Sequence, residues 1–246
     1  MDIYVAFAQG NRSHMEDTYC LELNFGGNKD WVFGGVFDGH MGSEVAELAA
    51  ERMPGMFLEK IKSGEGTEKS FEDSYEEISG MGNFFNVGCT ALSFFIKKNE
   101  IWVANAGDSR MISLNRRNTE QITTDHRVDN NRELSRVKRA GAKVKAGYVC
   151  RGDPGLMPTR SLGDHYFKEV GIIARPDIFF RKIRGAKAAF VAATDGVWDE
   201  MENEAVASVV RESESSREAA GVILSICLTG SMMAVDNLTV IVIRNY

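Results

Sequence analysis

The sequence predicts an α+β layered architecture built on antiparallel strands, and two observations favour it. Strand-like and helix-like segments come in blocks instead of strict alternation, which argues against a doubly wound parallel sheet. Strand-like neighbours such as 90–97 and 101–105 are separated by too few residues for a crossover helix, so they should pair antiparallel. Because no linker, low-complexity segment or repeat divides the chain, we expect one domain over residues 1–246.

The expected elements follow from the spacing of apolar residues along the chain. Strand patterns cover residues 3–8, 31–37, 90–97, 101–105, 110–114, 178–183, 188–193 and 238–243. Helical patterns cover residues 43–62, 71–78, 131–140 and 203–228, with a break in the last one near Ser213. With 43% hydrophobic residues in 246, these elements can bury a sizeable core.

Composition excludes several classes of function. The net charge of -6 argues against nucleic acid as a partner, since phosphate backbones call for a basic face. No apolar run is long enough to cross a bilayer, and the first residues, MDIYVAFAQGNR, lack the features of a signal peptide. We therefore expect a protein of the cytoplasm or nucleus, monomeric and not bound to membranes.

The cysteines do not signal a structural or catalytic site. Cys20, Cys89, Cys150 and Cys227 form no C-x-x-C pair, which argues against a disulfide framework or a zinc site. The position six residues after each of them is not arginine, so the nucleophile of a phosphocysteine mechanism is absent.

One segment is basic within this acidic chain. Seven basic residues lie between positions 127 and 145: Arg127, Arg132, Arg136, Lys138, Arg139, Lys143 and Lys145. A solvated helix face is the simpler interpretation, and a surface that receives an anionic ligand or a phosphorylated substrate is the alternative.

Acidic residues recur at the ends of strand patterns. They are Asp38, Asp108, Asp195, Asp199 and Asp236, with Glu16 and Asp17 as an adjacent pair. Any one of them could simply cap a turn. A cluster of carboxylates at one edge of a layered core would repel itself unless cations lay within it. Oxygen ligands without cysteine select hard cations, so the pattern predicts Mg²⁺ or Mn²⁺.

The stretch VFDGHMGSE places a histidine beside the first of these carboxylates. Gly39 and Gly42 either end a strand or let a backbone carbonyl approach a metal ion. His40 is either an exposed turn residue or a general acid that a neighbouring carboxylate keeps protonated.

Eight short motifs in order carry a resemblance to a known family. They are R-S-H-M-E-D (12–17), D-G-H-M-G (38–42), G-C-T-A (88–91), A-N-A-G-D-S-R (104–110), T-T-D-H (123–126), T-R-S-L-G-D (159–164), T-D-G-V-W-D (194–199) and D-N-L-T (236–239). This series, which runs from the first strand to the last, resembles the metal-dependent protein serine/threonine phosphatases of the PPM, or type 2C, family.

The resemblance implies a fold and a site. The fold is a sandwich of two antiparallel sheets flanked by helices, with two metal ions at one end. The implied metal ligands are Asp38 as the bridging carboxylate, Gly39 through its carbonyl oxygen, Asp195, Asp236, Glu16 and Asp17. Asp108 and Asp199, sharing Asp195, match a third, weaker metal site. Arg12 is similar to the family's phosphate-binding arginine and His40 to its general acid.

The implied activity is hydrolysis of phosphoserine and phosphothreonine on proteins by a water activated at a two-metal centre. A catalytically silent scaffold of the same fold is the alternative, although such a protein should have lost metal carboxylates that are present here. A metal-dependent nuclease would explain the carboxylates but not Arg12 or the acidic composition. Met41 departs from the family's D-G-H-G-G, and because Gly39 is intact we expect activity to survive.

Overall fold

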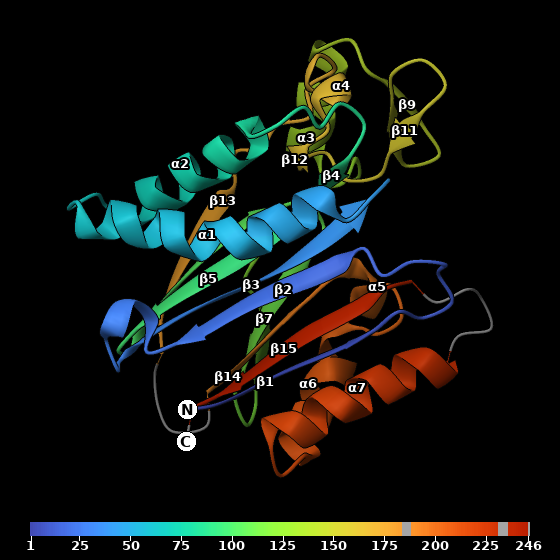
Figure 1. The fold of residues 1–246 in the computed structure, drawn as a ribbon. Helices are drawn as coiled ribbons and strands as arrows, with labels where there is room; N and C mark the ends of the chain where they lie inside the picture. Colours follow the sequence, from blue (N-terminus) through green and yellow to red (C-terminus); the bar gives the residue numbers. More distant parts are fainter. Residues whose placement is uncertain (184–187, 231–235, 246) are drawn as a thin grey trace.

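Two antiparallel sheets lie face to face between two pairs of helices, which confirms the predicted α+β sandwich (Figure 1). The computed structural model describes residues 1–183, 188–230 and 236–245. None of the helices in these ranges combines the length and apolar character that a membrane span requires.

The first sheet contains the two ends of the described chain. Its strand order is β1 (Asp2–Ala8), β15 (Leu238–Arg244), β14 (Ala189–Ala193), β7 (Arg110–Leu114) and β8 (Thr119–Gln121). Helices α6 (Asn203–Glu212) and α7 (Ser216–Gly230) cover its outer face, and the predicted break near Ser213 separates them (Figure 1).

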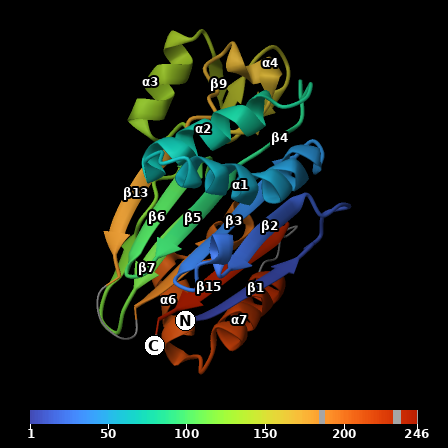
Figure 2. The same ribbon diagram turned by 60° about the vertical axis from the view of Figure 1, so that its left-hand side comes forward.

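The second sheet is built around one long buried strand, β3 (Trp31–His40). Its order is β12 (Leu162–Gly163), β4 (Gly88–Cys89), β3, β5 (Ala91–Lys97), β6 (Glu100–Ala106) and β13 (Asp177–Lys182), with β2 (Asp17–Leu23) paired to β3. Helices α1 (Glu44–Lys62) and α2 (Thr67–Gly80) cover its outer face (Figure 2).

The alternation of side chains along β3 divides the core into layers. Val32 and Val36 lie between the sheets, in one cluster with Ile241 of β15. Phe33 and Phe37 point to the opposite face and pack in the cluster beneath α1 and α2. Both faces of β3 are therefore buried, which explains its nearly continuous apolar run.

A glycine within β3 makes room for an aromatic ring. A Cβ on Gly34 would lie 2.5 Å from Cζ of Phe94 on the neighbouring β5. The glycine thus serves packing, whereas a side chain there would displace a buried phenylalanine.

Between residues 125 and 176 the chain forms a flap beyond the end of β3 (Figure 1). Its elements are α3 (Asn131–Arg139), a small sheet of β9 (Lys143–Lys145), β10 (Tyr148–Cys150) and β11 (Gly155–Leu156), and α4 (His165–Lys168). Val137, Val149 and Phe167 belong to an apolar cluster of its own. The sequence did not predict this small sheet, nor β2, β4, β8 and β12.

Candidate metal centre and phosphate site

Most of the predicted site residues meet in one cleft at the flap end of the sandwich. The cleft has a volume of about 440 Å³. Its lining includes Arg12, Glu16, Asp38, Gly39, His40, Met41, Asp108, Asp195, Asp236 and Asn237, together with Tyr148 and Leu156 of the flap. Of the other two predicted residues, Asp17 is buried beside it and Asp199 is largely exposed.

Asp38 is a partly buried carboxylate at the centre of the predicted site. It follows the apolar run of β3 and pairs in register with Asp17 of β2. Burial, and then the charges of Asp195 and Asp17, raise the pKa of Asp38 well above its usual range. The strand thus brings a carboxylate into a place where it is costly to ionise without a neighbouring cation.

Two further carboxylates share this environment. Burial, and then the charges of Asp108 and Asp199, raise the pKa of Asp195 to about 8. Burial is also the main reason that the pKa of Asp17 rises to about 7, although a hydrogen bond from Thr194 opposes it. The carboxyls of the cleft are therefore costly to ionise together unless a cation lies among them.

The donor set fits hard divalent cations. Carboxylates and a backbone carbonyl offer oxygen only, which suits Mg²⁺ or Mn²⁺. Within the described residues, no three acidic, histidine or cysteine side chains are already drawn together tightly enough to hold an ion. Two arginines, Arg12 and Arg127, reach among the carboxylates instead.

Glycines set how closely the motif segments approach one another. A Cβ on Gly39 would lie 2.5 Å from the carbonyl oxygen of Glu16, and Gly39 donates its backbone N–H to that oxygen at 3.2 Å. A Cβ on Gly196 would lie 2.1 Å from the carbonyl oxygen of Asn237. These backbone approaches bring the residue after Asp38 up to Glu16 and the residue after Asp195 up to Asn237.

Asn237 holds the loop that carries Glu16. Its side-chain oxygen accepts a hydrogen bond from the Glu16 backbone N–H at 2.7 Å. Its amide nitrogen donates to the carbonyl oxygens of Gln9 at 2.8 Å and His14 at 3.0 Å. The side chain next to Asp236 therefore fastens the first motif to the last strand.

His40 is oriented by a carboxylate from the flap. Its Nε2 lies 2.7 Å from Oδ2 of Asp164, which is itself buried. Burial alone would lower the pKa of His40, but the charge and hydrogen bond of Asp164 outweigh it and raise that pKa. Gly88 leaves space for this carboxylate, since a Cβ there would lie 2.1 Å from Asp164 Oδ2.

Arg12 lies at the exposed side of the cleft. Its Nη2 donates to Asp236 Oδ2 at 2.6 Å, and 59% of its side chain is accessible to solvent. An exposed guanidinium beside a carboxylate cluster can bind a tetrahedral anion through two parallel hydrogen bonds.

The three carboxylates predicted for a weaker third ion surround Arg127. This residue forms ion pairs with Asp108, Asp195 and Asp199. The simpler interpretation of the basic run placed both Arg127 and Arg136 on a solvated face. Arg136 instead donates hydrogen bonds to the carbonyl oxygens of Gly171 and Thr159. Arg127 and Arg136 therefore form ion pairs and hydrogen bonds within the protein.

A family model supplies the comparison that decides the family. The model described as protein phosphatase 2C matches residues 1–234. The chain belongs to the protein phosphatase 2C family. Seven of the eight motifs lie within the matched residues, and the eighth, D-N-L-T (236–239), follows shortly after them.

Relatives of this phosphatase 2C chain occur in plants and yeast. It is similar to "Probable protein phosphatase 2C 65" of Arabidopsis thaliana, with 30% identity over 89% of this chain and 68% of the relative. It is also similar to "Protein phosphatase 2C homolog 1" of Schizosaccharomyces pombe, with 29% identity over 95% of this chain and 69% of the relative. It spans only 54% of another Arabidopsis relative, "Probable protein phosphatase 2C 71".

Solved structures of the family share the fold. A serine-threonine phosphatase 2C from Toxoplasma gondii superimposes with a TM-score of 0.86 at 20% identity, covering 100% of this chain and 95% of that one. A C. elegans sex determining protein superimposes with a TM-score of 0.82 at 21% identity, covering 98% and 64%. At these identities the likeness shows the fold alone.

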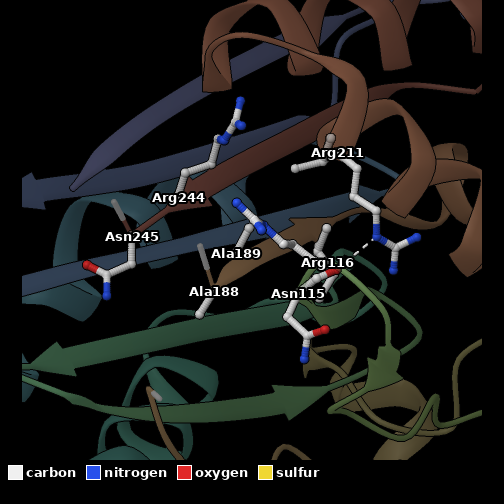
Figure 3. A pocket seen from close by; sticks show the side chains of 9 residues that line it. Asn115, Arg116, Ala188, Ala189, Arg211, Arg244 and Asn245 are labelled. Atoms are coloured by element: carbon white, nitrogen blue, oxygen red, sulfur yellow. Dashed lines mark hydrogen bonds between the residues drawn. The ribbon is translucent and has the colours of Figure 1, made fainter. Parts of the chain in front are cut away.

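A second cavity of this phosphatase 2C fold lies at the far ends of the strands (Figure 3). Its volume is about 230 Å³, and Arg116, Arg211 and Arg244 line it. Arg211 donates to the carbonyl oxygen of Asn115 at 2.9 Å, the bond drawn in Figure 3, and pairs with Glu204. Because β15 begins just after Asp236 and ends at Arg244, this cavity is remote from the carboxylate cleft.

Sequence reasoning missed three residues that position the site. Asn237 and Asp164 stand inside quoted motifs, but their partners lie 221 and 124 positions away along the chain. Arg127 was assigned to a surface cluster because it begins a run of basic residues. For each of these three residues, the sequence signal was the motif or the basic run that contains it, and this signal did not indicate the partner.

Proposed function

We propose that this chain is a metal-dependent protein serine/threonine phosphatase that hydrolyses phosphoserine and phosphothreonine at a two-metal centre. One observation carries the proposal: a single cleft joins the partly buried carboxylate Asp38, an exposed arginine and a histidine paired with a carboxylate. The names of the similar plant and yeast proteins, which are protein phosphatases 2C, support the phosphatase part of this proposal.

The metal ligands would be the oxygen donors of the cleft. Asp38, the carbonyl of Gly39, Asp195, Asp236 and Glu16 would hold two Mg²⁺ or Mn²⁺ ions, with Asp17 beside them. When bound, two such ions lower the pKa of a water molecule that can attack phosphorus and offset charge on the phosphoryl oxygens.

The chain's own residues would bind the substrate and deliver a proton. Arg12 would exchange its bond to Asp236 for a bidentate contact with the phosphoryl group, which its exposure permits. His40 is bonded to Asp164 through Nε2, so the proton for the departing seryl or threonyl oxygen would come from Nδ1. No protein side chain need act as the nucleophile.

Phosphate release from a phosphothreonine peptide tests the proposal. We expect turnover with Mn²⁺ and none with EDTA, loss to the EDTA level in Asp38→Asn, and a decrease of about 10²- to 10⁴-fold in His40→Ala. Asp30→Asn is the matched control, because Asp30 is exposed and lies at the opposite end of β3. If the folded wild-type protein released no phosphate in the presence of Mn²⁺, the alternative of a catalytically silent scaffold would be favoured instead.

A further inference from the structure

Arg127 is surrounded by three carboxylates from separate segments, and each of its nitrogens has a different partner. Nε donates to Asp108 Oδ2 at 2.7 Å, Nη2 to Asp195 Oδ2 at 2.9 Å and Nη1 to Asp199 Oδ1 at 3.1 Å. The planar fork of a guanidinium suits such convergent contacts, whereas the compact ammonium of lysine would not reach all three in this way.

The cluster places a positive charge beside a buried carboxylate. Asp108 is only 2% exposed, and Nε of Arg127 lies 2.7 Å from its Oδ2. A buried carboxylate without a partner is strongly destabilising, so whichever cation stands here stabilises the fold as well as the site.

The backbone around Arg127 is fixed against the strand end that carries Asp108. The neighbouring His126 donates its N–H to the Gly107 carbonyl at 3.0 Å, and Gly107 donates its N–H to His126 Nδ1 at 3.1 Å. Thr159 of the flap donates its N–H to the His126 carbonyl at 2.7 Å. This clamp holds the first residues of the flap against the strand end that carries Asp108, and it does not depend on the ion pairs themselves.

We propose that Arg127 is the built-in third cation of this centre: its guanidinium stands where a third metal ion would otherwise bind and positions Asp195. This inference rests on the proposed two-metal function. Asp108, Asp195 and Asp199 do not fit a third ion here, since the oxygens it would need accept hydrogen bonds from Arg127. Arg127 thereby links the flap to a ligand of the centre.

Counting Mn²⁺ ions by isothermal titration calorimetry tests the proposal without an activity measurement. We expect two ions per chain in the wild type and in Asp199→Asn, and three in Arg127→Met. The third ion should disappear in the double variant Arg127→Met/Asp199→Asn. The matched control Arg132→Met, which removes an exposed arginine of the same basic run, should bind two.

Thermal melting provides a second test, which remains informative if Arg127→Met folds poorly. In EDTA, Arg127→Met should melt several degrees below the wild type and Arg132→Met should not, because only the first leaves the buried Asp108 without a counter-charge. The inference would be overturned if the wild type bound a third Mn²⁺ ion and Asp199→Asn lost it. It would also be overturned if the Arg127→Met variant bound two ions and melted at the same temperature as the wild type. Failure of the wild type to bind any Mn²⁺ would overturn the proposed function with it.

Discussion

Replacing Arg160 with methionine should destabilise the protein strongly, although the residue does not line the carboxylate cleft. Arg160 is only 2% exposed, and its guanidinium donates to Glu133 at 2.8 and 3.1 Å and to Asp177 at 2.9 Å. Methionine fills much of the same volume but leaves both carboxylates without this partner.

The size of the effect follows from what these contacts do for Glu133. Burial alone would raise the pKa of Glu133, but hydrogen bonds from Arg160 and Arg136 outweigh it and lower the pKa from 4.5 to about 2. A difference of that size corresponds to roughly 3 kcal/mol. Breaking a buried ion pair on one side generally costs about 3–5 kcal/mol, so we expect a loss of about 3 kcal/mol.

Urea denaturation followed by tryptophan fluorescence, at a fixed Mn²⁺ concentration, measures the loss. At this chain length about 3 kcal/mol corresponds to a decrease in Tm of roughly 6–12 °C. Arg139→Met is the matched control, because Arg139 is exposed and, among the described residues, bonds only the Ser135 carbonyl of its own helix. That variant should stay within about 0.5 kcal/mol of the wild type.

A double variant separates the charge effect from lost packing. Glu133→Leu/Arg160→Met removes both members of the buried Arg160–Glu133 pair, so it should be less destabilised than Arg160→Met alone. A loss below about 1 kcal/mol in Arg160→Met, or a double variant that merely adds the two single losses, would refute the reasoning.

Two further predictions concern acid and backbone strain. Because the pKa of Glu133 is lower in the folded than in the unfolded chain, its stabilisation is complete above about pH 4.5 and is lost as pH falls toward 2. Urea midpoints between pH 5 and 2.5 should therefore fall less steeply in Glu133→Gln, and parallel slopes would contradict this. Met41 has a φ of 61° and a 77% exposed side chain, so Met41→Gly should gain up to about 1 kcal/mol and retain turnover. Met41→Ala, which keeps the strained conformation, should show no gain in the same denaturation assay.

The sequence predicted best those elements whose side chains are buried on both faces. The final strand β15 has six buried residues in succession, LTVIVI, and its apolar run was evident. The missed strand β2 buries only Asp17 and Cys20 fully, so its sequence shows neither a run nor a clean alternation. The flap strands have only two or three residues, which is too short for a period to be recognised.

The site was predictable as a set of residues but not as a set of partners. Asp38 and Asp195 could be found because each ends an apolar strand pattern. That Arg127 would pair with Asp195, 68 positions away, depends on how the flap folds back over the strand ends. Spacing along a chain does not encode such distances, so long-range counter-charges stay hidden until the fold is known.

The close backbone approaches at Gly39, Gly88 and Gly196 change which positions are diagnostic of an intact centre. A carboxylate can be replaced by its amide with the backbone undisturbed, and the loss is then confined to one ligand. At these three glycines even a methyl group would meet an oxygen atom at 2.1 to 2.5 Å, and Gly39 and Gly196 face backbone carbonyls that cannot rotate aside. In comparing distant members of the family, a missing glycine at either place is therefore a stronger sign of a distorted cleft than one altered acidic residue.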